Sequence, residues 1–576
     1  MSLAGGKSFD RLPGRPVAAA LLVAARRRLS WELAGSAPHR WLLSQARPTG
    51  LGAIPNDLRP GNPSLGRQIV AGAFVLAGET LALGRGGNPW NRASPSRRFA
   101  VALHRFVWLR DLLAAGPEGS AEALRLTLEW SRTFGGWNAF AWSPEALERR
   151  VFNLACAIRA LSVRASDAEA SQLALDLARQ ARFLLRIDDG PARAAERAAA
   201  AALAATALAA DRLLAHALDR LRRALRAAAP AEGGHGSRSP QAALELYFDL
   251  AALDEALSQR GLAPPEELSR ALDRLGTAVR FFTLRDGRLA AFQGGEALER
   301  AYVAAAQMRD ELEGRPMPAE CGGYHRLESP AIQVMVDAAP AAPGAWSVTA
   351  CAQPLAVEVL VGGRRLFVGG GWSPDAQAPQ AMRLVDAAST LAMADAACGE
   401  PLRGLAAEML GPRLAGAARQ VEVRRHAAPH ALWLEAGHDG WVDRFGLRHE
   451  RRLYLDLRTE ELRGEDRLRP ANRASGADGR RFLPFSARFH LHPDVHAQVA
   501  RDGQSVLLRT GGDDRGWWLR NDALEVSLEP SVHFQMGQAR RSQQIVLRGQ
   551  ARVAEGARLR WKLSAARRVD AASDAA

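Results

Sequence analysis

The chain has 576 residues, of which 47% are hydrophobic and 24% charged, and its formal net charge is +14. This length exceeds what a single hydrophobic core sustains, and the composition is that of a globular protein, which excludes a fibrous or disordered chain. The basic balance favours a polyanionic partner, but the arginines are scattered over amphipathic segments with no nucleic-acid-binding motif, so we expect no nucleic acid.

Cysteine spacing and the length of apolar runs exclude further classes of protein. The four cysteines, Cys156, Cys321, Cys351 and Cys398, form no C-x-x-C pair, so neither a zinc knuckle nor a thioredoxin-like site is indicated. The most apolar early run, from Pro16, is too short to span a bilayer and has no clear cleavage site. We therefore expect no transmembrane segment and no signal peptide, which favours a cytoplasmic over a periplasmic location.

In chain order, residues 1–60 are rich in Arg, Pro and Gly, and we interpret them as an N-terminal arm and linker. The sequence AGAFVLAGETLAL, from Ala71, predicts a short β-hairpin or turn-rich piece. Either Ser94 or Ser96 is placed to cap the helix that follows, which carries Trp108 on its apolar face.

From about residue 97 to 315, apolar residues recur at intervals of three and four. The pattern is clear in RRFAVALHRFVWLRDLL, in PEALERRVFNLACAIRALSV and in PEELSRALDRLGTAVRFFTL. Helices of similar length joined by short polar turns predict stacked antiparallel helix pairs. We assign residues 61–315 to such a domain, whose closed form is an incomplete α/α toroid with a groove at the helix ends.

Beyond residue 316, alternation of apolar and polar residues replaces the helical period. AIQVMVDA, LAVEVLVGGRRLFVGG, HERRLYLDLR, SARFHLHP and RLRWKLSA are examples, with turn residues about every ten positions. We assign residues 316–576 to an antiparallel β-sandwich. The predicted fold class is thus α then β in two domains, a toroid followed by a sandwich.

The segment GGHGSRSP, residues 233–240, lies in the middle of the helical half. Ser239 is a good N-cap and Pro240 suits the first helical turn. His235 and Arg238 would then lie on a tight, exposed loop at the mouth of a helix, where binding groups concentrate. A plain connecting loop with a solvated histidine is the alternative.

Several stretches resemble the heparinase II/III family of polysaccharide lyases, in its divergent bacterial branch. They include PNDLRPGNPSLGRQIVAGAFVLAGE, HRFVWLRDL, GGHGSRSP and LDRLGTAVRFF in the helical half. In the β half they include GYHRLESPAIQVMVDAAPAAP, GWVDRFGLRHERRLYLDL and RFHLHPDVHA. The similarity runs from about residue 50 nearly to the C-terminus, and no single motif is specific, but their order and number are.

The resemblance implies β-elimination on an acidic polysaccharide that contains uronic acid. That reaction needs a group that neutralises the uronate carboxylate, a base for the C5 proton and an acid for the departing oxygen. We assign His235 and Tyr324 as the catalytic candidates. Arg238, Arg280 and His325 are the substrate-binding candidates, since the arginine fork suits a carboxylate. For Arg238, pairing with a buried aspartate is the alternative.

Four tyrosines limit the choice of a phenolic base. Tyr247 stands in the apolar context LELYFDL and is expected in the core, whereas Tyr302 follows the FQGG loop and could reach the groove. Tyr324 lies at the domain boundary beside His325. Tyr454 is expected to pack or to face solvent.

The sequence departs from the family at the zinc site and at the catalytic histidine of the sandwich. Cys351 and Gln353 stand at histidine-like positions, Gly369 near the place of an aspartate and Ala388 near that of the last histidine. We therefore expect no metal and no other cofactor, because one cysteine is a poor site. Two function hypotheses remain open: a lyase, or a degenerate relative that binds acidic envelope glycan without cleaving it.

Two histidine groupings in the β half carry a structural alternative. His490 and His492 share one face of a strand, but two ligands are not a metal site, which favours a structural or solvent-facing role. His438 and His449 flank a polar turn that either lines the groove or closes a hairpin.

Overall fold

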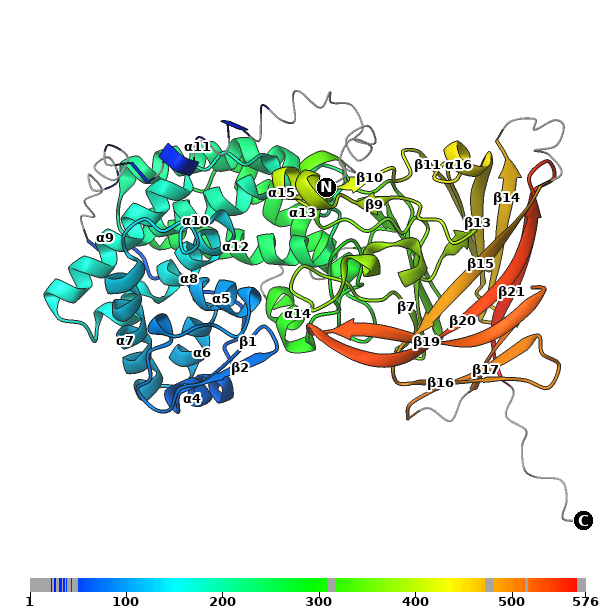
Figure 1. Cartoon of the computed structure of the whole chain (residues 1–576), viewed down its shortest axis with the longest axis horizontal. Coiled ribbons are helices and arrows are strands. Elements are labelled where there is room, and N and C mark those ends of the chain that lie inside the picture. The colour runs from blue at the N-terminus through cyan, green and yellow to red at the C-terminus, as the bar shows by residue number, and fades with distance from the viewer. Residues whose placement is uncertain are drawn as a thin grey trace, which may run out of the picture.

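A computed structural model describes residues 50–308, 316–471, 481–512 and 516–566, together with scattered positions between 22 and 43. Most of the arm that we predicted for residues 1–60 lies outside the described residues. The described chain forms a helical domain followed by a strand-rich domain, and the two pack side by side along the long axis of the molecule (Figure 1). This is the predicted order of α then β.

Helices fill the first part of the described chain. Their bounds are α4 (Pro63–Val70), α5 (Arg97–His104), α6 (Trp108–Ala114), α7 (Pro117–Phe134), α8 (Pro144–Ser162), α9 (Asp167–Leu184), α10 (Ala194–Ala207), α11 (Asp211–Ala228), α12 (Pro240–Gln259), α13 (Glu266–Phe282) and α14 (Arg300–Gln307). The predicted hairpin after Ala71 is confirmed as β1 (Ala73–Leu76) paired with β2 (Glu79–Ala82). Ser96 caps α5 by accepting from the Phe99 N–H.

The α10 helix is the centre of the toroid. Its residues 195–207 are all buried, and nine of these thirteen are alanine. Alanine favours the helix and adds little bulk, so α8, α9, α11 and α12 can all approach α10 closely. Within the described part of the chain, no helix is long and apolar enough to cross a membrane.

Strands fill the second part and form two large antiparallel sheets. The first has the order β19-β20-β15-β7-β6-β5-β4-β3, with β8 also paired to β15, and the second has the order β11-β12-β13-β14-β21-β18-β17-β16. The bounds in the first sheet are β3 (Glu320–Cys321), β4 (Tyr324–Glu328), β5 (Ile332–Asp337), β6 (Val357–Val361), β7 (Arg364–Val368), β8 (Leu391–Met393), β15 (Phe482–Leu491), β19 (Glu525–Gln535) and β20 (Gln538–Arg552). Those in the second are β11 (Val421–Ala428), β12 (Ala431–His438), β13 (Leu447–Asp456), β14 (Glu461–Pro470), β16 (Val495–Val499), β17 (Ser505–Thr510), β18 (Gly516–Asn521) and β21 (Ala557–Ala565).

Short elements complete the strand-rich domain. These are β9 (Glu400–Pro401), β10 (Leu414–Ala415), α15 (Gly404–Leu410) and α16 (Val442–Phe445).

The molecule has three layers, with the first sheet in the middle. All residues of β5 and β6 are buried, because one face of this sheet meets the second sheet and the other meets the helices. Met335 and Leu360 belong to the core of the helical domain, whereas Val334 and Val359 belong to the core between the sheets. In the second sheet, β13 alternates strictly between buried and half-buried residues, so its outer face is open to solvent.

The β19–β20 hairpin reaches from the sandwich to the helical domain (Figure 1). At its tip, Gly537 donates its N–H to Glu296 Oε2 at 2.7 Å. The Glu296 carboxylate also accepts from Ser373. The hairpin therefore ties the FQGG region of the helical domain to the sandwich.

Candidate functional site at the junction of the two domains

The GGHGSRSP segment connects α11 to α12 as the sequence predicts. Ser239 is the N-cap of α12, its hydroxyl accepts from the Ala242 N–H, and Pro240 occupies the first turn. A side-chain oxygen at this position satisfies one of the free N–H groups of the helix start.

The prediction that this loop is exposed is wrong. His235, Ser237 and Ser239 keep only 4%, 6% and 3% of their accessible surface. The turn between β3 and β4 lies on the loop, and its Gly322 N–H donates to the Glu232 carbonyl at 2.8 Å. Sequence reasoning placed the loop at a helix mouth without the sandwich that covers it.

The His235 side chain is enclosed between a carboxylate and an indole. Its Nδ1 accepts from the Ser237 N–H at 3.2 Å, so a proton lies on Nε2, which is 3.5 Å from Glu196 Oε1. Burial alone would raise the pKa of Glu196, but Arg193 and His235 lower it to about 2. The ring edge rests against Trp346, with centroids 5.3 Å apart.

Arg238 is bound to the sandwich by its whole guanidinium. Nη2 lies 2.5 Å from Asp337 Oδ1, Nη1 donates to the carbonyls of Ala339 and Pro340 at 3.2 and 3.0 Å, and Nε donates to the Gly322 carbonyl at 3.3 Å. The backbone of Arg238 has a φ of 64°, a left-handed conformation that costs free energy in a residue with a side chain. The alternative of pairing with a buried aspartate therefore describes Arg238 in this structure.

Tyr324 lies under Arg238 and is fully buried. Its hydroxyl donates to the Arg238 carbonyl at 2.8 Å, and the Arg238 guanidinium stacks over its ring at 4.7 Å. Phe282 and Phe292 close the remaining sides of the ring. Burial, together with the charge of Asp337, raises the pKa of the Tyr324 phenol well above its usual value, so the hydroxyl is protonated at neutral pH.

Gln293 completes the cluster and was not singled out as a site residue from the sequence. Its Nε2 donates to Asp337 Oδ2 at 2.7 Å, and its Oε1 accepts from the Cys351 N–H at 2.9 Å. Asp337 is therefore held by Arg238 on one oxygen and by Gln293 on the other. The only sequence signal was the FQGG turn, since the partner residues come from a different domain.

The other two predicted substrate contacts come from β4 and α13. His325 follows Tyr324 on β4, so its side chain points to the opposite face of the strand. It is buried, its Nε2 lies 4.0 Å from Glu320 Oε1, and burial lowers its pKa. Arg280 is half-buried in the last turn of α13. The structure thus brings Arg238 and Tyr324 together and directs His235 and His325 elsewhere.

Of the remaining tyrosines, Tyr247 and Tyr454 lie as the sequence predicts, whereas Tyr302 does not reach the groove and points into a buried cluster. Tyr247 is buried in the helical core. Tyr302 donates its hydroxyl to Glu245 Oε1 at 2.8 Å, inside a buried cluster with Arg59. Tyr454 is half-buried on the outer face of the second sheet.

Comparisons with known proteins agree with this architecture. Residues 314–562 match the family model described as "Heparinase II/III-like, C-terminal". Over 562 residues the chain is 50% identical to FtsZ-localized protein C of Caulobacter vibrioides (strain NA1000 / CB15N), covering 96% of this chain and 97% of that protein.

Three solved structures have a similar fold at low sequence identity. Heparinase III superposes with a TM-score of 0.67 at 14% identity and covers 97% of this chain and 93% of its own. A mutant of the heparan sulfate lyase HepC from Pedobacter heparinus has a TM-score of 0.57 at 14% identity, with 97% and 92% covered. Chondroitin AC lyase of Streptomyces coelicolor A3 has 0.53 at 12% identity, with 96% and 83% covered. The chain belongs to the heparinase II/III family.

The residues at the zinc positions of the heparinase II/III family do not fit a metal. Cys351 packs into an apolar cluster with Trp372 and Phe534, and burial raises the pKa of its thiol to about 11. Gln353 donates its amide to two backbone carbonyls. Within the described residues, no group of three or more His, Cys, Asp or Glu side chains is arranged to hold an ion. An isolated neutral thiol is a weak ligand for zinc.

The histidine pairs of the sandwich are buried and hydrogen-bonded inside it. His438 Nδ1 accepts from the Gly440 N–H, so its Nε2 donates to His449 Nδ1 at 3.1 Å, and His449 Nε2 donates to Asp466 Oδ1 at 2.8 Å. Arg451 binds the same carboxylate. Burial lowers the pKa of both imidazoles. This chain of neutral rings stabilises the core and does not line a groove.

His490 and His492 are also buried in the sandwich. His490 is buried, Nδ1 lies 2.8 Å from Ser531 Oγ, and Nε2 donates to the Asp386 carbonyl at 2.9 Å. His492 packs against His533 with ring centroids 5.5 Å apart. His490 is therefore structural, whereas His492 follows the end of β15 and lies at the edge of a surface crevice.

Proposed function

We propose that this heparinase II/III-family chain is a binding protein for an acidic glycan of the cell envelope, and that it does not cleave the glycan. The observation that supports this is the ion pair of Arg238 with Asp337. β-Elimination needs a cation available to the uronate carboxylate and a base that is deprotonated or can accept a proton. Arg238 already neutralises Asp337, and Tyr324 donates its proton to a carbonyl.

The junction also lacks the histidine that could serve as the second proton-transfer group. At the position where the family carries a histidine, Cys351 presents a thiol whose pKa is raised to about 11 by burial. A neutral thiol is a poor base at neutral pH. The fold that binds a polymer is thus retained, while its acid–base groups are committed to internal contacts.

A lyase assay combined with a binding assay tests the proposal. Purified protein is mixed with uronate polymers, and the absorbance of an unsaturated uronate is followed at about 230 nm while binding is measured by calorimetry. We expect binding without any rise in absorbance and without shortening of the polymer.

A rise in absorbance would instead support the second candidate, a lyase. In that mechanism His235 and Tyr324 act on protons, and Arg238, Arg280 and His325 hold the substrate. The meeting of Arg238 and Tyr324 in one cluster favours it. Tyr324→Phe should then abolish the product, and its loss would establish the lyase and refute the binding-only function.

We further propose that the chain associates with FtsZ-containing assemblies. This rests on its 50% identity, over nearly the full length, to a protein named for FtsZ localisation. Co-sedimentation with purified FtsZ tests it: the chain should pellet when FtsZ is polymerised with GTP and remain in the supernatant with GDP. Equal sedimentation in both nucleotides would contradict the association.

A further inference from the structure

The outer face of the second sheet carries one row of residues that crosses six strands. Register pairs join His426 to Trp433, Trp433 to Tyr454, Tyr454 to Arg463, and then Arg463 to Lys562 and Lys562 to Arg520. We call these six residues the outer row. Five strand spacings of about 4.8 Å make it about 24 Å long.

One half of the outer row is aromatic. The rings of His426 and Trp433 are nearly parallel, at 24° with centroids 5.1 Å apart, and those of Trp433 and Tyr454 make 28° at 6.2 Å. The hydrophobic core of the sandwich lies on the opposite face of this sheet, so these rings do not contribute to it. Neighbouring aromatic rings on a solvated face are typical of an interaction site. They offer π surface to a ligand with polarised C–H groups.

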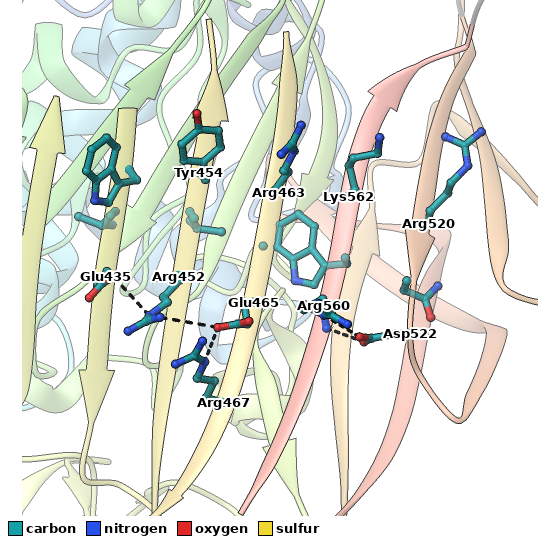
Figure 2. A pocket seen from close by; sticks show the side chains of 16 residues that line it. Glu435, Arg452, Tyr454, Arg463, Glu465, Arg467, Arg520, Asp522, Arg560 and Lys562 are labelled. Atoms are coloured by element: carbon teal, nitrogen blue, oxygen red, sulfur yellow. Dashed lines mark hydrogen bonds and ion pairs between the residues drawn. The ribbon is translucent and has the colours of Figure 1, made fainter. Parts of the chain in front are cut away.

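The other half of the outer row is cationic. Arg463, Lys562 and Arg520 lie in line beyond Tyr454 (Figure 2). The side chains of Arg463 and Lys562 are 53% and 38% exposed, and both pair with a single carboxylate, Glu461. Two of the three cations thus share one anion, and Arg520 donates to the Ser564 hydroxyl at 3.4 Å, which leaves positive charge available to a ligand.

The adjacent row on the same face is neutralised. Arg452 lies 3.3 Å from Glu435 and 3.9 Å from Glu465, and Arg560 lies 2.9 Å from Asp522 (Figure 2). Alternating charges on neighbouring strands satisfy one another. The excess of positive charge is therefore a property of the outer row and not of the whole face.

A groove of ≈ 690 Å³ follows these residues and is lined from β12, β13, β14, β18 and β21. A second crevice, of ≈ 370 Å³, lies where the sandwich meets the helices and, like the groove, is lined by five arginines. There, however, Arg365 binds Asp286 and Glu358, and Arg540 binds Asp494. The groove along the outer row has the greater volume and places Trp433 and Tyr454 beside its cations.

We propose that the outer row is the binding site for a uronic-acid glycan, which lies across the strands with sugar rings against Trp433 and Tyr454 and carboxylates at Arg463, Lys562 and Arg520. This inference rests on the proposed function, because it supplies the site for a glycan that the junction cluster does not hold. Arginine forks bind carboxylates in two-point contacts. A linear polymer with a carboxylate on each sugar can place some of its rings on the aromatic half of the row and the carboxylates of the following sugars at the cationic half.

Calorimetry with size-defined oligogalacturonate tests the site. Arg463→Gln/Arg520→Gln should weaken binding at least about tenfold and reduce its dependence on salt, since two charge contacts are lost. Trp433→Leu should weaken binding about fivefold without changing that dependence, because a ring contact is not screened. The matched control is Arg212→Gln/Arg226→Gln on α11, which removes two exposed charges from the helical domain and should leave binding unchanged.

The outcomes separate this inference from the function on which it rests. If the wild-type chain binds no uronate oligomer, the proposed function fails. If it binds but the outer-row variants bind equally well, only this site is refuted. Equal affinity for polyglutamate or oligothymidylate, with no effect of Trp433→Leu, would show a general polyanion surface and would also refute the glycan site.

Discussion

Two regions of this molecule stack an arginine on a tyrosine, and the two pairs differ in burial. At the junction, the Arg238 guanidinium lies 4.7 Å over the ring of Tyr324, and both are enclosed and satisfied by Asp337 and backbone carbonyls. On the outer sheet face, the Arg463 guanidinium lies 5.8 Å over the ring of Tyr454 and remains half-exposed. Residue identity is the same, so burial decides whether the cation stabilises the fold or is available to a ligand.

Acid should destabilise the buried region strongly and leave the exposed cations intact. Burial lowers the pKa of His104 and His533 to about 3 and of His490 and His492 to about 4. Because each is 6.5 when unfolded, the unfolded chain binds more protons below that pH. Stability is therefore full above about pH 6.5 and is lost as pH falls toward the lowered values, by about 2 kcal/mol per histidine at pH 5.

Urea denaturation between pH 7 and pH 5 measures this effect. His490→Gln should reduce the slope of the unfolding free energy against pH by up to about 1.4 kcal/mol per pH unit. The reason is that the unfolded chain then takes up one proton fewer relative to the folded chain. Glycan binding by the protein that remains folded should not change, since Arg and Lys stay charged. A free energy of unfolding that is flat from pH 7 to pH 5 would contradict the buried, neutral state of these histidines.

Breaking the ion pair of Arg238 with Asp337 should cause the next largest loss in the free energy of unfolding. Arg238→Ala leaves Asp337 buried without its cation, and removing one member of a buried pair destabilises by about 3–5 kcal/mol. The matched change in the exposed region, Arg463→Ala, should cost about 0–1 kcal/mol. Thermal unfolding of both variants provides the measurement.

The same pair of variants distinguishes structure from substrate contact. We expect Arg238→Ala protein to keep its affinity for oligogalacturonate at a temperature where it is folded. An Arg238→Ala variant with unchanged stability and no glycan binding would make Arg238 a substrate clamp and overturn the contrast between the two regions.

Gly464→Ala tests the floor of the outer groove. A Cβ at Gly464 would overlap the ring of Trp561, whose Nε1 donates to Asp466 Oδ2 at 3.2 Å. Overpacking of this kind costs about 1–3 kcal/mol. Gly136→Ala is the control, since a Cβ there meets nothing within 4 Å. Equal unfolding temperatures for both variants would refute the close packing of Trp561 on β14.

The smallest stability effect belongs to the outer row. Arg463→Gln/Arg520→Gln should change the free energy of unfolding by about 0.5 kcal/mol or less, because exposed side chains contribute little to stability. The same variant is expected to lose most of its glycan affinity. A large drop in unfolding temperature would assign these arginines to the fold and weaken the contrast.

Local patterns predicted most elements that the structure contains. The period of three and four residues predicted the helices from α5 to α14 but not α4, and alternation predicted the strands of the sandwich. Ser239 and Pro240 marked the start of α12. These succeed because capping, turn chemistry and periodicity depend on residues that are near in sequence.

Predictions that required distant residues fared less well. His235 and Arg238 were recognised as unusual, but the loop was expected to be open, and its cover comes from the β3–β4 turn some 85 residues later. Gln293 was not singled out as a site residue because its partners Asp337 and Cys351 lie in the other domain. The outer row escaped notice since β21 separates β14 from β18 in the sheet, an order that alternation does not encode.

By itself, then, the sequence determined the two-domain order, the element types, the family resemblance and the missing histidine at Cys351, all of which are written in local pattern. Only the tertiary structure decided which arginines are bound within the fold and which are exposed to a ligand. Arg238 and Arg463 have the same ionisable group, but one is surrounded by Asp337 and carbonyls and the other lies on a solvated strand face. Availability of a charge depends on what the chain brings beside it, and that is set by packing between segments far apart in sequence.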